Sequence, residues 1–274
     1  MPIPLLKHHF CRRHNAGPKA HAHAAYLSGT KLDDGYGTTA DFTPKGGILH
    51  AELWVPESAP KWAKDRGELW RRLEEREDLS TRPSQAILAH KFIGALPHEL
   101  TFEENIRYVK DYVREQFTRR GYAADWAIHA PDPGSDSRNY HVHIMVPLRR
   151  FENGTWAKTK DRFPTNSPAL SHFIQEKQGA FFELQNRYLR KNGIDARIIR
   201  QNGKWTVVEQ AGLATKTSQP IYRDAAANRA WSASQSHSTA PAPGGLIITH
   251  HQIAATSQTS TGTASGKYAA QHTP

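Results

Sequence analysis

Residues 140–146, with the sequence Tyr-His-Val-His-Ile-Met-Val, constrain this chain more than any other stretch. The segment is short, apolar and partly β-branched, which predicts a β-strand, and alternate side chains of a strand share one face. His141 and His143 therefore point the same way from a strand whose other residues must be buried. Burying two polar rings without partners costs on the order of 1–3 kcal/mol each, and metal ligation is the simplest way to satisfy them.

A third histidine, His129, comes near the end of a second apolar run at residues 122–130. A loop rich in Pro, Gly, Asp and Ser joins this run to the first. If the two runs pair as antiparallel neighbours, His129 returns beside His141 and His143. Three neutral imidazoles suit a divalent metal with positions left open for water or a substrate oxygen.

Other roles for these residues stay open at this point. A lone histidine is more often a surface or core residue, and in a chain with 16 histidines an accidental His-x-His is plausible; residues 21–23 hold a second one. Asp132 and Asp136 in the intervening loop are candidate acceptors that orient the imidazoles. Loop aspartates, however, usually stabilise turns.

The remaining patterns mix strands with helices. Thr101 and Glu104 form a capping box that opens an amphipathic helix, and residues 201–204, Gln-Asn-Gly-Lys, predict a hairpin. Further predicted elements are strands at 3–10 and 48–55 and a helical turn and strand within 86–96. Helices are predicted from 60 and at 167–191, as are a short helix within 20–32 that ends in Gly29 and a turn at 33–37. These patterns predict an α+β domain over residues 1–214, with a central antiparallel sheet that carries the His-x-His strand and helices packed on it.

From residue 215 onward Ser, Thr, Ala and Gln dominate and the periodicity vanishes. This composition predicts a mostly disordered, low-complexity tail over residues 215–274, in which the apolar residues 246–248 are a candidate docking peptide.

The balance of charge indicates an anionic partner. The formal net charge is +10 and the pI is about 9.7, so nucleic acid is the first candidate. The single cysteine, Cys11, excludes an intrachain disulfide and a cysteine-based zinc site. No signal peptide is apparent and no apolar run approaches membrane-spanning length, so we expect a soluble, cytoplasmic protein.

In a basic protein, the apt task for a metal with open positions is to polarise a phosphate oxygen. A tyrosine is the candidate nucleophile, because a phenolate near a metal can form a covalent phosphodiester to the protein. Tyr26 lies among small residues in the segment AAYLSG, residues 24–29, where a DNA backbone could approach closely. The alternative is that Tyr26 is a core aromatic side chain on a short helix.

Several separate segments together resemble one family. They are AAYLSG at 24–29, GILHAEL at 47–53, ALPHEL at 95–100, AIHAPD at 127–132 and DSRNYHVHI at 136–144, with a weaker continuation in GIDAR at 193–197. Their order and spacing resemble the MobA/MobL family of plasmid mobilisation relaxases, which belong to the HUH endonucleases.

This resemblance implies that His129, His141 and His143 hold a divalent cation, Mg²⁺ or Mn²⁺, and that Tyr26 cuts one DNA strand at a plasmid origin of transfer. Attack by Tyr26 releases a 3′ hydroxyl and leaves a 5′-phosphotyrosine, which preserves the bond energy for rejoining. The implied partners are single-stranded DNA at the origin, accessory relaxosome proteins and a type IV secretion coupling protein. Export with the DNA to a recipient cell is a further expectation.

Basic side chains outside these segments are candidate phosphate contacts, although each one alone is more often a solvated surface charge. They are Arg12, Arg13, Lys19, Lys31, Arg149, Arg150, Lys158 and Lys160.

The chain departs from the family pattern in two places. Relaxases of this type carry an acidic residue shortly before the Ala-Leu-Pro strand end, whereas residues 90–94 here read His-Lys-Phe-Ile-Gly. Upstream of the tyrosine the family tends to have Ser and Ala, whereas this chain has His21 and His23.

Two rival interpretations follow. Tyr188 lies on the long helix after the histidine strand, where rolling-circle replication initiators and related transposases place their nucleophile. A DNA-binding protein with a degenerate metal site is the other alternative.

Overall fold

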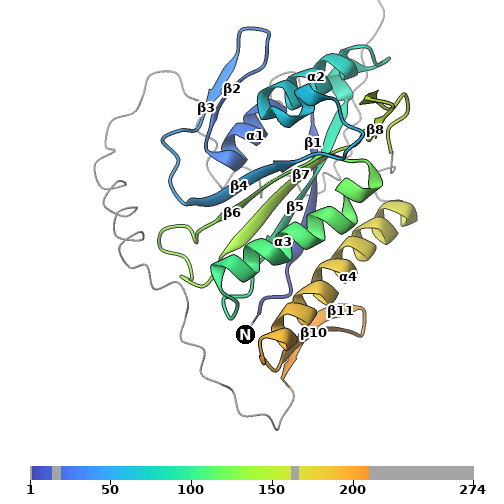
Figure 1. Ribbon diagram of the computed structural model, residues 1–274. Coiled ribbons are helices and arrows are strands. Elements are labelled where there is room, and N and C mark those ends of the chain that lie inside the picture. The colour runs from blue at the N-terminus through green and yellow to red at the C-terminus, as the bar shows by residue number, and fades with distance from the viewer. Residues whose placement is uncertain (1, 14–19, 162–166, 210–274) are drawn as a thin grey trace, which may run out of the picture. The chain divides into compact units, whose positions relative to one another are not determined.

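The computed structural model describes residues 2–13, 20–161 and 167–209 (Figure 1). The predicted tail, residues 215–274, and the candidate phosphate contact Lys19 lie outside the described residues. Within the described ranges, no helix is both long enough and apolar enough to cross a membrane.

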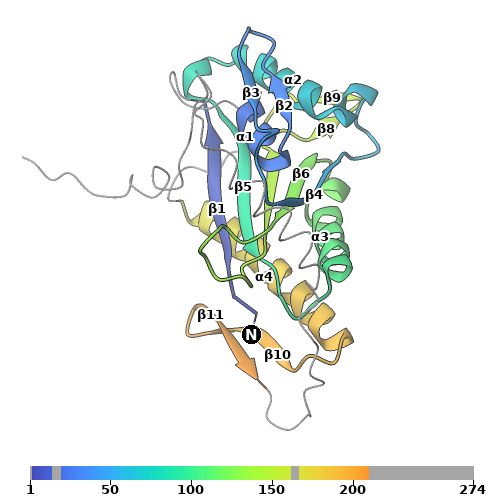
Figure 2. The same ribbon diagram turned by 90° about the vertical axis from the view of Figure 1, so that its left-hand side faces the viewer.

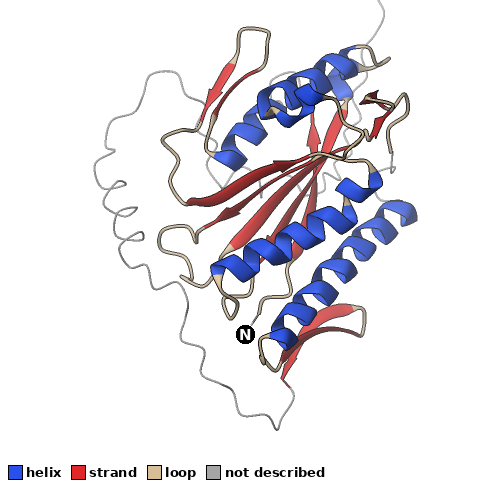
Figure 3. Ribbon diagram, in the orientation of Figure 1, coloured by secondary structure: helices blue, strands red, loops and turns tan. Residues whose placement is uncertain are grey.

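A five-stranded antiparallel sheet forms the centre of the fold, in the order β1-β5-β7-β6-β4 (Figure 3). The strand that carries His141 and His143 is the central one, so it has a hydrogen-bonded neighbour on each side. The strands are β1 (Leu6–Arg12), β4 (Ile48–Trp54), β5 (Ile87–Ala95), β6 (Ala124–His129) and β7 (His141–Pro147).

Helices cover both faces of the sheet. The pair α1 (Ala20–Ser28) and α2 (Arg66–Asp78) lies above the strands in Figure 1, and the pair α3 (Phe102–Gln116) and α4 (Pro168–Lys191) lies below them. Single-turn 3₁₀ helices occupy η1 (Lys61–Lys64), η2 (Pro83–Gln85) and η3 (Thr118–Arg120).

The two faces of the sheet pack into different cores. Large residues such as Trp126, Val142 and Ile144 point toward α3 and α4, where they join the main aromatic and aliphatic core. Ala127 and Met145 point the other way, into a second core with α1 and α2. Because side chains alternate along a strand, His129, His141 and His143 share this second face.

Three two-stranded ribbons complete the fold. The pair β2 (Lys31–Asp33) and β3 (Thr39–Asp41) projects beyond the end of the sheet, as Figure 2 shows. The others are β8 (Phe151–Glu152) with β9 (Thr155–Trp156), and β10 (Ala196–Gln201) with β11 (Lys204–Glu209).

The predicted fold class is confirmed: the domain is α+β, and the His-x-His strand lies in a central antiparallel sheet. The capping box is also present, since the Thr101 side chain accepts from the Glu104 amide and the Glu104 carboxylate accepts from the Thr101 amide. The hairpin predicted around residues 201–204 turns through Asn202 and Gly203, both with positive φ. The short helix expected within residues 20–32, with Gly29 at its end, is α1, which ends at Ser28, and Gly29 has a φ of +64°.

Candidate metal centre and nucleophile

The register between β6 and β7 brings the three histidines together. His129 is directly opposite His141, and His143 is opposite Ala127, one pair further along the same face. The ring centres are 4.4 Å apart for His129 and His143, 5.0 Å for His141 and His143, and 5.6 Å for His129 and His141. One nitrogen from each ring lies within 4.8 Å of the other two, a spacing at which three ligands can share one ion.

Backbone carbonyls orient two of the rings. His129 Nε2 is 2.8 Å from the carbonyl oxygen of Leu27 in α1, and His141 Nδ1 is 3.0 Å from the carbonyl oxygen of Asn139. A ring nitrogen that donates to a carbonyl leaves the lone pair of the other nitrogen for a metal. We therefore assign Nδ1 of His129 and Nε2 of His141 as the ligand atoms.

The structure places the two loop aspartates differently. The exposed Asp136 carboxylate accepts from the Arg138 guanidinium at 2.7 Å and 3.0 Å, which is a local turn contact. Asp132 lies close enough to Tyr26 and Lys45 to affect the pKa of both. The carboxylate of Asp132 therefore acts on the nucleophile side of the centre.

The protonation states of His129 and His143 suit metal binding. Burial lowers the pKa of His129 to about 3, with a further decrease from Lys45. Burial also lowers the pKa of His143 well below its ordinary value, and the neighbouring His129 acts in the same direction. Neutral imidazoles at physiological pH offer lone pairs, so the donor set fits a divalent cation.

Tyr26 lies on α1 directly beside this centre. Its ring centre is 6.4 Å from that of His129 and 5.4 Å from that of Phe42. Ala24 and Ala25 are fully buried, and these small side chains let α1 pack closely on the sheet. Burial raises the pKa of Tyr26, and the Asp132 carboxylate raises it further, so the neutral phenol is favoured at physiological pH.

Lys45 lies beside the same groups, although no motif or periodicity predicted it. Its Nζ atom is 4.3 Å from the Tyr26 ring centre and 3.4 Å from His129 Nδ1. Burial lowers the pKa of Lys45 to about 8, although the Asp132 carboxylate raises it. Lys45 lies in the short connection between β3 and β4, where neither periodicity nor a motif distinguishes one lysine from another.

The residues at the two departures from the family pattern lie next to α1. Lys91 of β5 reaches His23, with 3.1 Å between Nζ and Nδ1. His21 is buried against Glu74 of α2, with 3.5 Å between Nδ1 and the carboxylate. Both histidines of the second His-x-His therefore face other partners, and neither belongs to the cluster of three.

The structure divides the candidate phosphate contacts into two groups. Arg149 is buried and Lys160 exposes only 6% of its side chain, and they bind Glu77 at 2.6 Å and 2.5 Å, so the Glu77 carboxylate compensates both charges. Arg13 is likewise paired with Glu74 and Asp78 of α2. The remaining described candidates reach the surface at least in part: Arg12 over the Phe10 ring, Lys31 near Asp41, Arg150 beside Glu152, and Lys158.

Comparison with known proteins assigns the family. The model described as the MobA/MobL family matches residues 19–204, which is more than half of the sequence. The chain belongs to the MobA/MobL family.

Relatives in this family carry names from DNA transfer. The chain is 30% identical over 203 residues to the conjugal transfer protein TraA of Agrobacterium fabrum, covering 64% of this chain and 18% of that protein. It is 30% identical over 210 residues to the mobilization protein MobL of Acidithiobacillus ferridurans, covering 67% of this chain and 54% of that protein. The chain thus spans only part of the length of these relatives.

A solved structure has the same fold. The structure described as "Molecular Basis of Vancomycin Resistance Transfer in Staphylococcus aureus" superposes with a TM-score of 0.60 at 24% identity. The superposition covers 72% of this chain and 98% of that one, so the fold extends over nearly the whole of the solved chain.

Tyr188, the rival nucleophile, lies on the opposite side of the sheet in this MobA/MobL chain. It belongs to α4 and packs against the core on the face away from the histidines. Its hydroxyl donates to Asp111 of α3 at 2.7 Å, a bond that raises the pKa of Tyr188 in addition to burial. Tyr188 therefore joins two helices and cannot reach the metal face.

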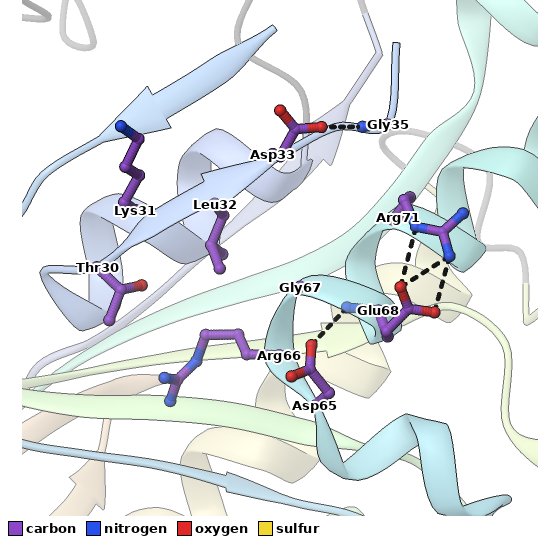
Figure 4. Close-up of a pocket in the computed structure, with 10 residues that line it drawn as sticks. All are labelled: Thr30, Lys31, Leu32, Asp33, Gly35, Asp65, Arg66, Gly67, Glu68 and Arg71. Atoms are coloured by element: carbon purple, nitrogen blue, oxygen red, sulfur yellow. Dashed lines mark hydrogen bonds and ion pairs between the residues drawn. The ribbon is translucent and has the colours of Figure 1, made fainter. Parts of the chain in front are cut away.

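A hollow of about 740 Å³ opens between β2 and the first turn of α2 (Figure 4). Its guanidinium groups are already paired, Arg71 with Glu68 at 2.7 Å and Arg66 with the buried Asp125 at 3.0 Å. The other lining residues are Thr30, Lys31, Leu32, Asp33, Gly35, Asp65 and Gly67. Charges of both signs line the hollow, so it lacks the excess of positive charge that favours a DNA backbone.

Proposed function

We propose that this protein is a metal-dependent DNA relaxase that nicks and rejoins one strand at a plasmid origin of transfer and so initiates conjugative mobilisation. The observation that carries the proposal is the position of Tyr26 beside three converging histidines. Membership of the MobA/MobL family and the names of its relatives, conjugal transfer and mobilization proteins, support the same process.

The chemistry follows from the residues at the site. His129, His141 and His143 would hold a divalent cation, Mg²⁺ or Mn²⁺, which when bound supplies Lewis acidity to a phosphate oxygen. Tyr26 attacks the scissile phosphorus in line, the bond to the 3′ oxygen breaks, and that oxygen takes a proton from water. The 5′-phosphotyrosine can then be attacked by a 3′ hydroxyl to rejoin the strand.

A site of three imidazole ligands predicts which of the two metals binds more tightly. Imidazole nitrogens are softer ligands than Mg²⁺ prefers, and Mn²⁺ binds such sites more tightly. We expect Mn²⁺ to support strand cleavage at lower concentration than Mg²⁺.

We propose single-stranded origin DNA as the substrate, with accessory relaxosome proteins and a type IV secretion coupling protein as partners. The positive charge of the chain is consistent with this substrate. Because strand cleavage would take place within the bacterial cytoplasm, we place the protein there before any export with the DNA.

The test replaces each candidate tyrosine. Tyr26→Phe should abolish the covalent protein–DNA adduct formed with origin single strand and Mn²⁺, because the attacking oxygen is lost. Tyr188→Phe is the matched control, since it removes the same atom from the opposite face of the sheet, and it should retain the adduct. An adduct formed by Tyr26→Phe would overturn the assignment of the nucleophile. Binding of origin DNA without cleavage by the unaltered protein under every divalent metal would instead indicate a non-catalytic DNA-binding protein.

A further inference from the structure

Lys45 lies at the junction of the nucleophile and the metal centre. Its ammonium group contacts the face of the Tyr26 ring and approaches the nitrogen of His129 that we assign as a ligand atom. A phosphate attacked by Tyr26 while it is bound at the three histidines must occupy the space between these groups. The ammonium of Lys45 is therefore next to the position of the scissile phosphate.

The backbone around Lys45 is anchored on both sides, so this position is built into the fold. The Phe42 amide donates to the carbonyl of Thr30, just after α1, at 3.1 Å, and the Lys45 amide donates to the carbonyl of Phe42 at 3.0 Å. On the other side, the Ala130 amide donates to the carbonyl of Gly47 at 2.7 Å, directly after His129. The connection thus ties the helix of the nucleophile to the strand of a metal ligand.

A structural contact alone would not explain this placement. A lysine over an aromatic ring contributes little stability where it remains accessible to water. Here the same ammonium also approaches His129 across a half-buried site, where placing a cation near a future metal ligand is unfavourable. The Asp132 carboxylate offsets part of this cost, and a phosphate anion bound beside the ammonium would offset more of it.

Resting on the proposed relaxase function, we propose that Lys45 is a further catalytic residue that contacts a non-bridging oxygen of the scissile phosphate. In the step, the bond between Tyr26 Oη and phosphorus forms and the bond from phosphorus to the 3′ oxygen breaks. The phenol proton leaves to water and the departing 3′ oxygen takes a proton from water. Lys45 transfers no proton; it stabilises the negative charge that accumulates on the phosphate oxygens.

The first experiment measures single-turnover adduct formation by full-length protein on origin single strand with Mn²⁺. Lys45→Met should lower the rate constant at saturating DNA about a hundredfold, the size seen when one charge-stabilising donor is removed, with DNA affinity changed less than about threefold. Lys45→Arg should recover most of the rate, because it restores a cation. Lys61→Met, at an exposed lysine of η1, is the control and should match the unaltered protein. A Lys45→Met effect confined to DNA affinity would overturn the proposal.

Chemical rescue separates a lost charge from a damaged fold. Lys45→Cys alkylated with 2-bromoethylamine regains an ammonium at nearly the same distance, and Cys11 is buried, so the reagent should modify position 45 selectively. The alkylated protein should recover to within about threefold of the unaltered rate constant. Folded, alkylated protein that stays inactive would contradict a role for the charge.

Metal affinity gives a readout that does not depend on activity. In the metal-free protein without DNA, Lys45→Met should bind Mn²⁺ about tenfold more tightly, since a positive charge next to His129 is removed. Unchanged or weaker Mn²⁺ binding would contradict the position of the Lys45 ammonium beside His129. If the unaltered protein forms no adduct at all, the proposed function itself fails, whereas an active unaltered protein with an equally active Lys45→Met variant refutes only the role of Lys45.

Discussion

The histidines of this chain show that one residue type can serve unrelated purposes on the two faces of a sheet. His129, His141 and His143 converge on the α1 face. On the opposite face, His8 of β1 and His90 of β5 bond to each other, with 2.9 Å between Nε2 and Nδ1. This second pair is surrounded by aromatic rings and joins the β1 edge to the sheet, so we assign it to folding.

The buried pair of His8 and His90 predicts that the folded protein loses stability as the pH falls. Burial lowers the pKa of His90 to about 3, and His8 lowers it further, whereas the unfolded chain titrates near 6.5. As the pH falls below 6.5 the unfolded state binds a proton that the folded state does not take up until about pH 3. The free energy of unfolding should therefore fall by about 1.4 kcal/mol per pH unit through this window from His90 alone. His90→Phe, which fits the aromatic surroundings, should remove that share of the slope.

Urea denaturation between pH 7 and pH 5 measures the effect. His172→Gln alters an exposed histidine on α4 and should leave the slope unchanged. An unaltered slope in His90→Phe would show that His90 already titrates normally in the folded protein.

Residue positions were predictable where they depend on local geometry. The shared face of His141 and His143 follows from strand alternation, and the approach of His129 follows from antiparallel pairing. Lys45 was not predictable, because its position depends on how a short connection folds back onto α1. Arg149 and Lys160 were candidate phosphate contacts because composition does not distinguish a buried cation from an exposed one.

At the scale of elements, α2 is fastened to the segment after β7 by a buried cluster of charges. Glu77, at 1% exposure, accepts from both Arg149 and Lys160. Burial alone would raise the pKa of Glu77, but the bonds from Lys160 and Arg149 outweigh it and lower the pKa. The ionised carboxylate therefore holds two cations in place.

Glu77→Gln should lower the free energy of unfolding by about 3–5 kcal/mol, because it leaves two buried cations without their counter-ion. Glu152→Gln is the matched control: its partner Arg150 is also bound at 2.7 Å, but both side chains are 45% exposed. An exposed pair should contribute less than about 1 kcal/mol. Equal losses in the two variants, measured by urea denaturation, would contradict the importance of burial.

Elements were predictable where a pattern repeats over several turns or strand residues. Amphipathic periodicity predicted both α3 and α4 correctly, and the capping box predicted where α3 begins. The ribbon β2–β3 was expected only as a turn, because three-residue strands offer no period to read. The end of α1 was predictable as well, because Gly29, which has a positive φ, directly follows the last helical residue, Ser28.

At the scale of the whole molecule, the sheet separates stability from chemistry. The main aromatic core packs on the α3 and α4 face, while α1, α2 and the three clustered histidines lie on the other face. A central strand held between two neighbours fixes the positions of His141 and His143. Tyr26 and the three histidines can therefore converge without weakening the main core.

The last prediction concerns the proposed domain boundary at residue 214. All described helices and strands end by Glu209, and residues 215–274 hold four basic and one acidic side chain, so most of the +10 charge belongs to residues 1–214. A protein that ends at residue 214 should have the same free energy of unfolding and the same rate of adduct formation as the full chain. Its log affinity for DNA should also fall with log salt at the same slope. For single-stranded DNA this slope is about −0.7 per phosphate neutralised. Fluorescence anisotropy over a salt series measures that slope. A markedly shallower slope with more than tenfold weaker binding would place part of the DNA interface beyond residue 214, because lost phosphate contacts reduce affinity and salt dependence together.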